Sequence, residues 1–234
     1  MDDLTIIYYT ANRISNYFLA STGKQLLAAA DGIPIISVSQ EPLELGENIC
    51  VGNIGVHTFN IYKQFLIGAK AAKTKYIAAA EDDVLYSHEH FHTRLPAPGT
   101  FLYDMNRWTI FTWSKPPIFS YKPDRVVLHQ LICERDLFIE AMEERFSKYP
   151  DQSMRKVFRF GEPGKHRDEK SLGVKLRVAK RFWSKKPSIV FCHREALQYV
   201  QFGKRKAPGP ERKKHLPGWG AAVDIAKLYR RADA

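Results

Sequence analysis

The apolar positions in the first third of the chain fall into two kinds of segment. Short continuous apolar runs, typical of strands covered on both faces, alternate with longer stretches in which apolar residues recur at helical spacing. The predicted strands are residues 4–10, 33–39 and 76–80, and the predicted helices are residues 16–30 and 58–73. Asp31-Gly32 is expected to end the first helix, and Thr58 is expected to cap the second. This β-α-β pattern predicts an α/β fold.

The rest of the chain changes character. Residues 99–122 are aromatic and strand-like, and Asp136 is expected to be the N-cap of a helix. Leu172, Leu176, Ala179 and Trp183 repeat at helical spacing, which predicts a basic amphipathic helix. The other predicted elements are strands at 126–133 and 188–192, a loop at 203–220 and a terminal helix at 221–231.

The composition excludes a disordered, a collagenous and a disulfide-stapled chain. With 44% hydrophobic and 26% charged residues, it is the composition of an ordinary globular protein. Its apolar runs are far shorter than the ~20 residues of a membrane span, and its acidic start does not resemble a signal peptide. The 3 cysteines are widely spaced. They indicate a reducing compartment, so we expect a cytoplasmic protein, in a host cell if the protein is viral.

Charge divides the chain unevenly. Residues 1–150 hold 14 Lys and Arg against 17 Asp and Glu, a balance of −3, whereas residues 151–234 hold 22 against 8, a balance of +14. A concentrated positive charge favours a polyanionic partner, such as nucleic acid, anionic lipid or a phosphorylated ligand. A basic but merely solvated surface is the alternative.

Glu81, Asp82 and Asp83 form an acidic cluster after the third predicted strand. Adjacent carboxylates repel one another, and a bound Mg²⁺ or Mn²⁺ compensates for this repulsion. In an extended segment, Glu81 and Asp83 would point to one side and Asp82 to the other. An acidic turn paired with Lys and Arg is the structural alternative.

The order of these elements resembles a known family. A β-α-β region, an Asn-containing loop, a helix ending in Ala-Lys-Thr-Lys-Tyr-Ile and then Glu-Asp-Asp are similar to the nucleotide-sugar half of GT-A glycosyltransferases, over residues 4–90. Their DXD-type motif follows such a strand, although here Glu81 replaces the first Asp. The resemblance implies that Asp83 is a metal ligand, and that Glu81 and Asp82 make sugar or second-layer contacts.

The resemblance also suggests roles for residues outside the motif. His193, at the end of a late strand, resembles the family's further metal ligand, and Lys204 and Lys206 resemble the loop that closes on the diphosphate. Nucleoside contacts are expected from the residues after the first strand, with Tyr9 stacking on the base: Tyr9, Thr10, Asn12 and Arg13. A purely structural role is the alternative for His193 and Tyr9, and a solvated basic loop for the lysines.

An inverting transfer needs a general base near the acceptor hydroxyl. Asp168 and Glu169 resemble in position the late acidic motif that supplies this base, with Asp168 slightly preferred. Glu134 and Asp136 compete for the role, although Asp136 is expected to be a helix cap.

Three alternating histidines offer a different chemistry. His88, His90 and His92 follow the acidic motif and would suit a zinc site, but the sequence supplies no evident fourth ligand. We therefore expect structural roles for them.

These observations predict one GT-A-like, Rossmann-like α/β domain with a mixed central sheet flanked by helices. Residues 1–95 would bind the nucleotide sugar, residues 96–203 the acceptor, and residues 204–234 would form a basic loop and helix. The expected reaction moves a hexose from UDP-glucose, with Mn²⁺ or Mg²⁺, to a 5-hydroxymethylpyrimidine in DNA, as in bacteriophage glycosyltransferases, and the protein is expected to be a monomer. The alternatives are a cell-envelope or lipid-linked acceptor and a metal-dependent nuclease.

Overall fold

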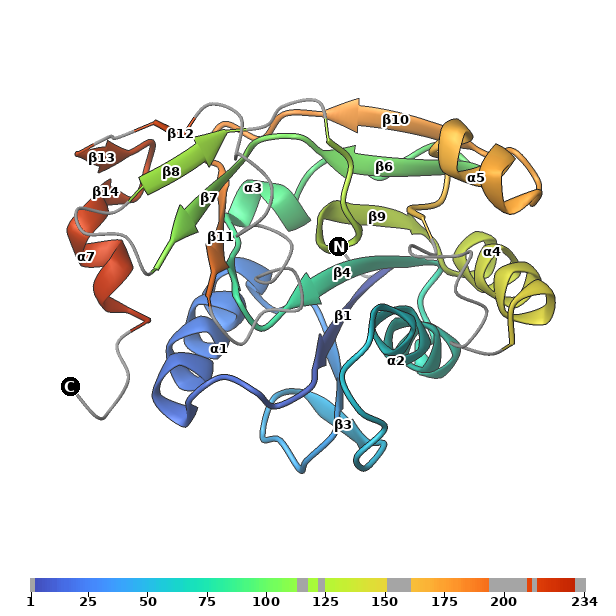
Figure 1. The fold of residues 1–234 in the computed structure, drawn as a ribbon, viewed down its shortest axis with the longest axis horizontal. Helices are drawn as coiled ribbons and strands as arrows, with labels where there is room; N and C mark the ends of the chain where they lie inside the picture. Colours follow the sequence, from blue (N-terminus) through green and yellow to red (C-terminus); the bar gives the residue numbers. More distant parts are fainter. Residues whose placement is uncertain are drawn as a thin grey trace.

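The structure, a computed structural model, describes residues 3–112, 118–121, 125–150, 161–193, 210–211 and 214–229. Two β-sheets form its frame, with helices packed on both sides of the larger one (Figure 1).

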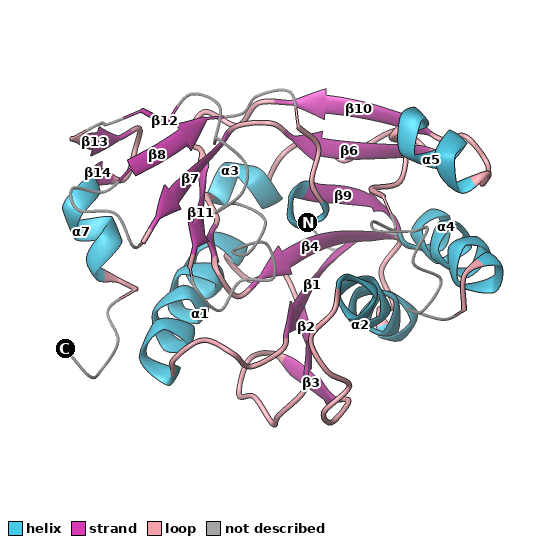
Figure 2. Cartoon of the chain, in the orientation of Figure 1, coloured by secondary structure: helices cyan, strands magenta, loops and turns pink. Residues whose placement is uncertain are grey.

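The larger sheet has seven strands in the order β10-β6-β9-β4-β1-β2-β3 (Figure 2). All neighbours pair in parallel except β9, which is antiparallel to both β4 and β6. The strands are β1 (Leu4–Thr10), β2 (Ile35–Ser39), β3 (Glu47–Cys50), β4 (Tyr76–Glu81), β6 (Thr100–Asp104), β9 (Leu131–Glu134) and β10 (Val178–Phe182). The predicted mixed central sheet flanked by helices is confirmed.

The second sheet has the order β12-β8-β7-β11-β5. Its strands are β5 (Val84–Leu85), β7 (Arg107–Phe111), β8 (Ile118–Tyr121), β11 (Ser188–Cys192) and β12 (Pro210–Glu211). A short hairpin, β13 (His215–Leu216) with β14 (Gly220–Ala221), lies beyond it. Because β5 follows β4 directly, the acidic motif lies where the chain passes from one sheet to the other.

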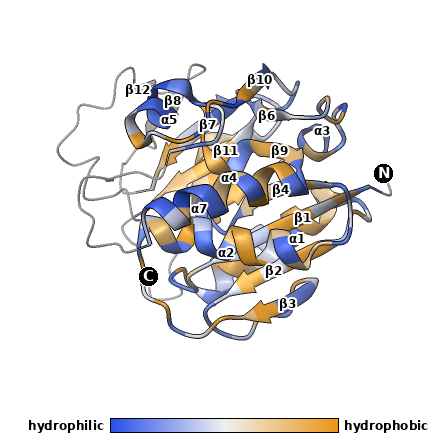
Figure 3. Cartoon of the chain, turned by 90° about the vertical axis from the view of Figure 1, so that its right-hand side faces the viewer, coloured by the Kyte–Doolittle hydropathy of each residue, from blue (hydrophilic) through white to orange (hydrophobic). Residues whose placement is uncertain are grey.

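The described helices pack against the two sheets. They are α1 (Asn16–Ala30), α2 (Thr58–Ala71), α3 (His88–Phe91), α4 (Arg135–Lys148), α5 (His166–Leu172) and α7 (Ala222–Lys227), with a 3-10 turn at Leu128–Gln130. One apolar core joins α2 and α4 to the sheet, and another joins α1 and α3 to its other face. A third core connects the start of α1 with the second sheet and α7. Figure 3 shows the hydrophobic residues concentrated on the inner strands.

Burial, capping and close packing explain the elements in the first half of the chain. All seven residues of β1 are buried, as expected for an interior strand covered on both sides. Ser15 caps α1 by accepting from the Phe18 N–H at 3.3 Å. Gly68 lets α2 approach β1, because a Cβ there would overlap the Ile7 side chain.

Both predicted helix caps are wrong by one or two positions. The ring of His57, not Thr58, caps α2 by accepting from the Phe59 N–H at 3.2 Å. Glu134 is the N-cap position of α4, so Asp136 lies inside the first turn. An Asp there still favours the helix, because its charge opposes the positive end of the helix dipole.

The predicted basic amphipathic helix is wrong. Gly173 ends α5 in the left-handed conformation, with φ of 62°, and the chain then forms strand β10 along β6. Two members of the supposed apolar face, Leu176 and Trp183, are 47% and 55% exposed. Their helical spacing was therefore fortuitous.

Among the residues that the structure describes, no helix is long and apolar enough to cross a membrane.

Candidate active site

The acidic motif lies where β4 ends. Glu81 is the last residue of β4, and Asp82 and Asp83 form the turn to β5. β5 pairs with β11, and the Phe191 N–H donates to the carbonyl oxygen of Asp83 at 2.8 Å. This pairing places Nε2 of His193, which follows β11, 3.5 Å from Oδ2 of Asp83. The structure thus brings together the two residues predicted as metal ligands.

Glu81 is engaged elsewhere, on the face of the sheet that α2 covers. The Tyr9 hydroxyl donates to its Oε1 at 2.9 Å, and Nδ1 of His129 lies 3.1 Å from its Oε2. The Tyr86 hydroxyl accepts from the Glu81 N–H and donates to the His129 carbonyl oxygen, at 3.0 and 3.1 Å. Glu81 is therefore held in a network of protein groups.

Asp82 lies with Asp83 on the His193 side. Its Oδ2 accepts from the Thr10 hydroxyl at 2.5 Å. Burial raises the pKa of Asp82 from 3.8 to about 7, and the Asp83 charge adds to this, while the Thr10 hydrogen bond and the His193 ring oppose it. The expectation that Glu81 and Asp83 share a side, with Asp82 opposite, is wrong because the extended backbone ends at Glu81.

Two buried oxygens near this pair have unmet hydrogen-bonding capacity. Within the described residues, neither Oδ1 of Asp83 nor the Tyr8 hydroxyl has a hydrogen-bond partner. Burial raises the pKa of Tyr8 well above 10.0, and the nearby charges of Asp82 and Asp83 raise it further. Carboxylate oxygen, imidazole nitrogen and unmet buried oxygens fit a hydrated Mn²⁺ or Mg²⁺.

The residues after β1 connect two loops. Asn12 adopts φ of 53°, and its N–H donates to the Thr10 hydroxyl oxygen at 2.9 Å. Its Oδ1 accepts from the backbone N–H groups of Gln40 and Glu41, at 2.9 and 3.1 Å. Asn12 therefore fixes the loops that follow β1 and β2, while the neighbouring Arg13 is exposed and accessible to a ligand.

The expectation that Tyr9 stacks on a nucleoside base is wrong in this structure. Tyr9 is 3% exposed, and its ring packs against Phe65 with centroids 5.6 Å apart. An exposed aromatic ring is instead available at Tyr17 in the first turn of α1, where 55% of the residue is accessible. The sequence did not distinguish these tyrosines, because the burial of Tyr9 depends on packing against Phe65 of α2, which is distant in the chain.

Two further residues that shape the site were not predicted. Nε2 of Gln64 donates to the carbonyl oxygens of Thr10 and Val38, at 2.8 and 2.9 Å, and so fixes the ends of β1 and β2. A polar residue beside Phe65 on the apolar face of α2 was a signal for Gln64. Nothing local pointed to His129, whose contact with Glu81 depends on the antiparallel pairing of β9 with β4.

The two predicted bases differ sharply in surroundings. Glu169 is fully buried, and its carboxylate accepts from the Gly164 N–H at 2.8 Å, the Arg177 N–H at 3.0 Å and the Arg145 guanidinium at 3.3 Å. Asp168 retains 17% exposure of its side chain, and Nζ of Lys165 lies 2.6 Å from its Oδ2. Glu169 therefore joins α4, α5 and β10 as a structural anchor.

Tyr62 is a buried residue of α2 whose pKa is affected by acids on both sides of it. Burial raises the pKa of Tyr62 well above 10.0. The charges of Glu162, Glu81 and Asp168 raise it further, although Arg145 opposes them. The competing base Glu134 instead accepts from the Gly99 N–H at 2.7 Å.

Part of the predicted basic surface is paired with acidic side chains of α4. Arg177 is buried, with its guanidinium 3.1 Å from Glu140 and 2.7 Å from Glu144, and Lys175 also pairs with Glu140 at 3.0 Å. Other cations on and after β10 are exposed: Lys180, Arg181 and Lys185. Lys204 and Lys206 lie outside the described residues.

The sequence matches no protein-family model and no curated protein. Among solved structures, the chain is similar to a glycosyltransferase involved in glycosylation of the major capsid of PBCV-1, with 12% identity and a TM-score of 0.47 over 85% of this chain and 98% of that one. It is also similar to a Drosophila β1,4-galactosyltransferase 7 mutant in complex with manganese, UDP-Gal and xylobiose, with 10% identity and a TM-score of 0.43 over 100% and 82%. A third similar structure is bifunctional IspDF from Campylobacter jejuni, with 9% identity and a TM-score of 0.42 over 79% of this chain and 50% of that one.

Proposed function

We propose that this chain is a metal-dependent glycosyltransferase of the GT-A type, which transfers a hexose from a nucleotide sugar to a hydroxyl acceptor. The observation that carries this proposal is the pairing of Asp83 with His193, 3.5 Å apart at the carboxyl end of β4. In open α/β sheets, ligands bind in the crevice outside the carboxyl ends of the strands.

Asp83 and His193 would hold the cation. A bound Mn²⁺ or Mg²⁺ would neutralise negative charge on the leaving diphosphate. Asp82, which Thr10 orients, would contact the sugar. Glu81 would act indirectly, because Tyr9 and His129 occupy both of its oxygens.

The donor would lie across the ends of β1 and β4. Arg13 supplies an exposed guanidinium next to Asn12, and guanidinium groups bind phosphate oxygens in bidentate fashion. Lys204 and Lys206 would add further charge to the diphosphate, as the family resemblance implies. UDP-glucose is the donor that we propose.

For an inverting transfer, Asp168 is the proposed general base. Its carboxylate would take the proton of the acceptor hydroxyl while that oxygen bonds to the anomeric carbon and the bond to the diphosphate breaks. Glu169 is less suited to this role, because Arg145 and two backbone N–H groups already occupy its carboxylate.

A 5-hydroxymethylpyrimidine in DNA is the proposed acceptor. Lys180, Arg181 and Lys185 are exposed close together in sequence, and Trp183 among them is 55% exposed. Cations neutralise the phosphate backbone, and an exposed aromatic ring can stack on an unpaired base. A hydroxymethyl group supplies the oxygen nucleophile, and the enzyme would have to expose the base.

The test incubates the full chain with Mn²⁺, UDP-glucose and duplex DNA containing 5-hydroxymethylcytosine or 5-hydroxymethyluracil. Digested nucleosides are then examined by mass spectrometry for an added hexose. Parallel reactions offer other sugar nucleotides, and a cell-envelope lipid extract as acceptor. The expected result is a hexose adduct on the modified base that chelator abolishes.

Asp83→Asn and His193→Ala are the variants expected to lose the adduct, and Glu89→Gln, at an exposed site on α3, is the matched control. A hexose on lipid would replace DNA as the acceptor, while slow release of UDP without any adduct would support only donor binding. DNA cleavage without sugar transfer would favour a nuclease. Metal-independent transfer would contradict the assigned role of Asp83 and His193.

A further inference from the structure

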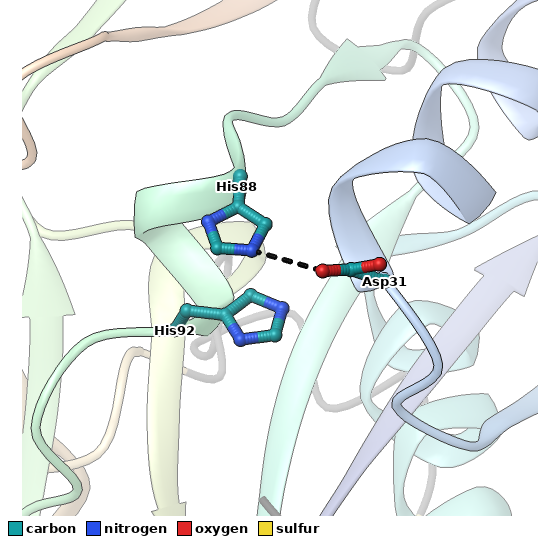
Figure 4. Close-up of side chains that lie close together, drawn as sticks. All are labelled: Asp31, His88 and His92. Carbon is teal, nitrogen blue, oxygen red and sulfur yellow. Dashed lines mark ion pairs between the residues drawn. The ribbon is translucent and has the colours of Figure 1, made fainter.

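A second group of potential metal ligands lies between α1 and α3. Asp31, His88 and His92 each offer a ligand atom, and these atoms all lie within 4.8 Å of one another (Figure 4). Nε2 of His88 is 3.4 Å from Oδ2 of Asp31. No other such group of three ligand atoms occurs in the part of the chain that the structure describes, and the Asp83–His193 pair is not part of it.

The group of ligands that the structure brings together differs from the three alternating histidines of the sequence. His90 is fully buried, with Nδ1 3.1 Å from Oδ2 of Asp104, and so points away from its two neighbours. Because α3 is helical, His88 and His92 lie one turn apart on the same side. Asp31, which is distant in sequence, takes the place of His90.

The backbone holds the three residues in place. Asp31 ends α1 in the left-handed conformation, with φ of 44°, and its N–H donates to the Leu27 carbonyl oxygen at 3.2 Å. The His92 N–H donates to the His88 carbonyl oxygen at 3.0 Å. Phe91 of α3 packs in the same core as the end of α1, which fixes the two elements against each other.

The side chains have a suitable arrangement and freedom to adjust. The two imidazole rings are stacked, with centroids 3.8 Å apart and planes 2° apart, and both face Asp31 (Figure 4). Nε2 of His92 also lies 3.1 Å from the Ala30 carbonyl oxygen. Parallel rings must tilt for their lone pairs to converge on one ion. The His88 side chain is 52% exposed, which leaves room for this tilt.

The donor set selects the type of metal. Two imidazoles and one carboxylate suit Zn²⁺ and similar borderline transition metals better than Mg²⁺. With zinc-to-ligand distances near 2.1 Å, two ligands of a tetrahedral ion lie about 3.4 Å apart. The observed separation between His88 and Asp31 agrees with this value.

We propose that Asp31, His88 and His92 bind one Zn²⁺ or similar transition-metal ion, with solvent completing its coordination. The ion would connect the end of α1 to the segment that leads from the acidic motif to β6. It would therefore stabilise the backbone behind the candidate active site without being part of it.

The test removes metal from the full chain with chelator and titrates Zn²⁺ by isothermal calorimetry, with melting temperature as a second readout. We compare the wild type with His88→Ala/His92→Ala, with Asp31→Asn and with the control Glu89→Gln on the same turn. Asp83→Asn/His193→Ala distinguishes the two candidate sites. All substituted positions in the proposed site are exposed or partly exposed, so circular dichroism should show an unchanged fold.

The wild type, the Glu89 control and the Asp83/His193 variant should each bind one equivalent of Zn²⁺ at the α1–α3 site and melt at a higher temperature with the metal. The His88/His92 variant should lose that equivalent, and Asp31→Asn should bind at least about tenfold more weakly. If the His88/His92 variant binds Zn²⁺ like the wild type, the proposal is overturned. This outcome is independent of glycosyl transfer, since the readout is binding.

Discussion

Two pairs of adjacent carboxylates have very different surroundings: Asp82 and Asp83 after β4, and Asp168 and Glu169 in α5. In α5, Glu169 is fully buried, yet Arg145 and two backbone N–H groups satisfy its carboxylate. At the end of β4, Asp82 has a pKa raised to about 7, and Oδ1 of Asp83 is buried without a hydrogen bond from the described residues.

The difference separates structural from functional acids. A buried charge that is fully paired stabilises the particular arrangement around it, whereas incompletely satisfied buried carboxylates cost free energy that a ligand can recover. The same distinction applies to the cations. Arg177 is paired inside the fold, whereas Lys180 and Arg181 are exposed.

The largest expected effect is on stability, when the fully paired Glu169 is replaced. Glu169→Ala removes the buried carboxylate that pairs with the buried Arg145, so we expect a loss of about 3–5 kcal/mol in the free energy of unfolding, measured by urea denaturation. Asp168→Asn should cost less than Glu169→Ala, because the Asp168 side chain is 17% exposed and that of its partner Lys165 is 31% exposed. Equal losses for the two variants would remove the distinction between them.

The next effect is on activity. Asp83→Asn should reduce hexose transfer by about 100-fold or more, because the diphosphate loses the charge stabilisation that the cation provides. The free energy of unfolding without metal should not fall, since the change removes a buried negative charge beside Asp82. A variant that is both unfolded and inactive would show a structural role for Asp83.

A smaller effect is expected on the pH dependence of the stability of the metal-free protein. The fold keeps a proton on Asp82 that the unfolded chain releases above pH 3.8, so stability falls as the pH rises from about 4 to about 7. With chelator present at pH 8, Asp82→Asn should therefore be more stable than the wild type by about 1–3 kcal/mol. Melting temperatures between pH 4 and pH 8 test this, and a destabilised variant with the same pH dependence would contradict it.

The smallest effect should be on DNA binding. Lys180→Ala/Arg181→Ala should weaken binding to duplex DNA and reduce the slope of log affinity against log salt by about 1.8, or roughly 0.9 for each lost phosphate contact. Lys175→Ala is the matched control, because Lys175 pairs with Glu140. Fluorescence anisotropy at several salt concentrations measures the affinity and the slope. An equal change in slope per cation removed would show that the pairing of Lys175 with Glu140 does not affect DNA binding.

Much of the fold could be predicted from the sequence where local chemistry decides it. The strands at 4–10 and 188–192 and the helix at 16–30 are confirmed, because apolar runs and helical spacing directly reflect burial. The segment around β10 could not be predicted in this way. Its apolar residues repeat at helical spacing, but Gly173 ends α5 and pairing with β6 draws the following residues into a strand.

By itself, the sequence determined the order of strands and helices in the first half, and the position of Glu81, Asp82 and Asp83 after a buried strand. These features depend on residues close together in the chain. Only the tertiary structure decided that Asp83 meets His193, that Glu81 is held by His129, and that Asp31 joins His88 and His92. Each of these contacts depends on the register of paired strands or the packing of two helices, which no local pattern in the sequence encodes.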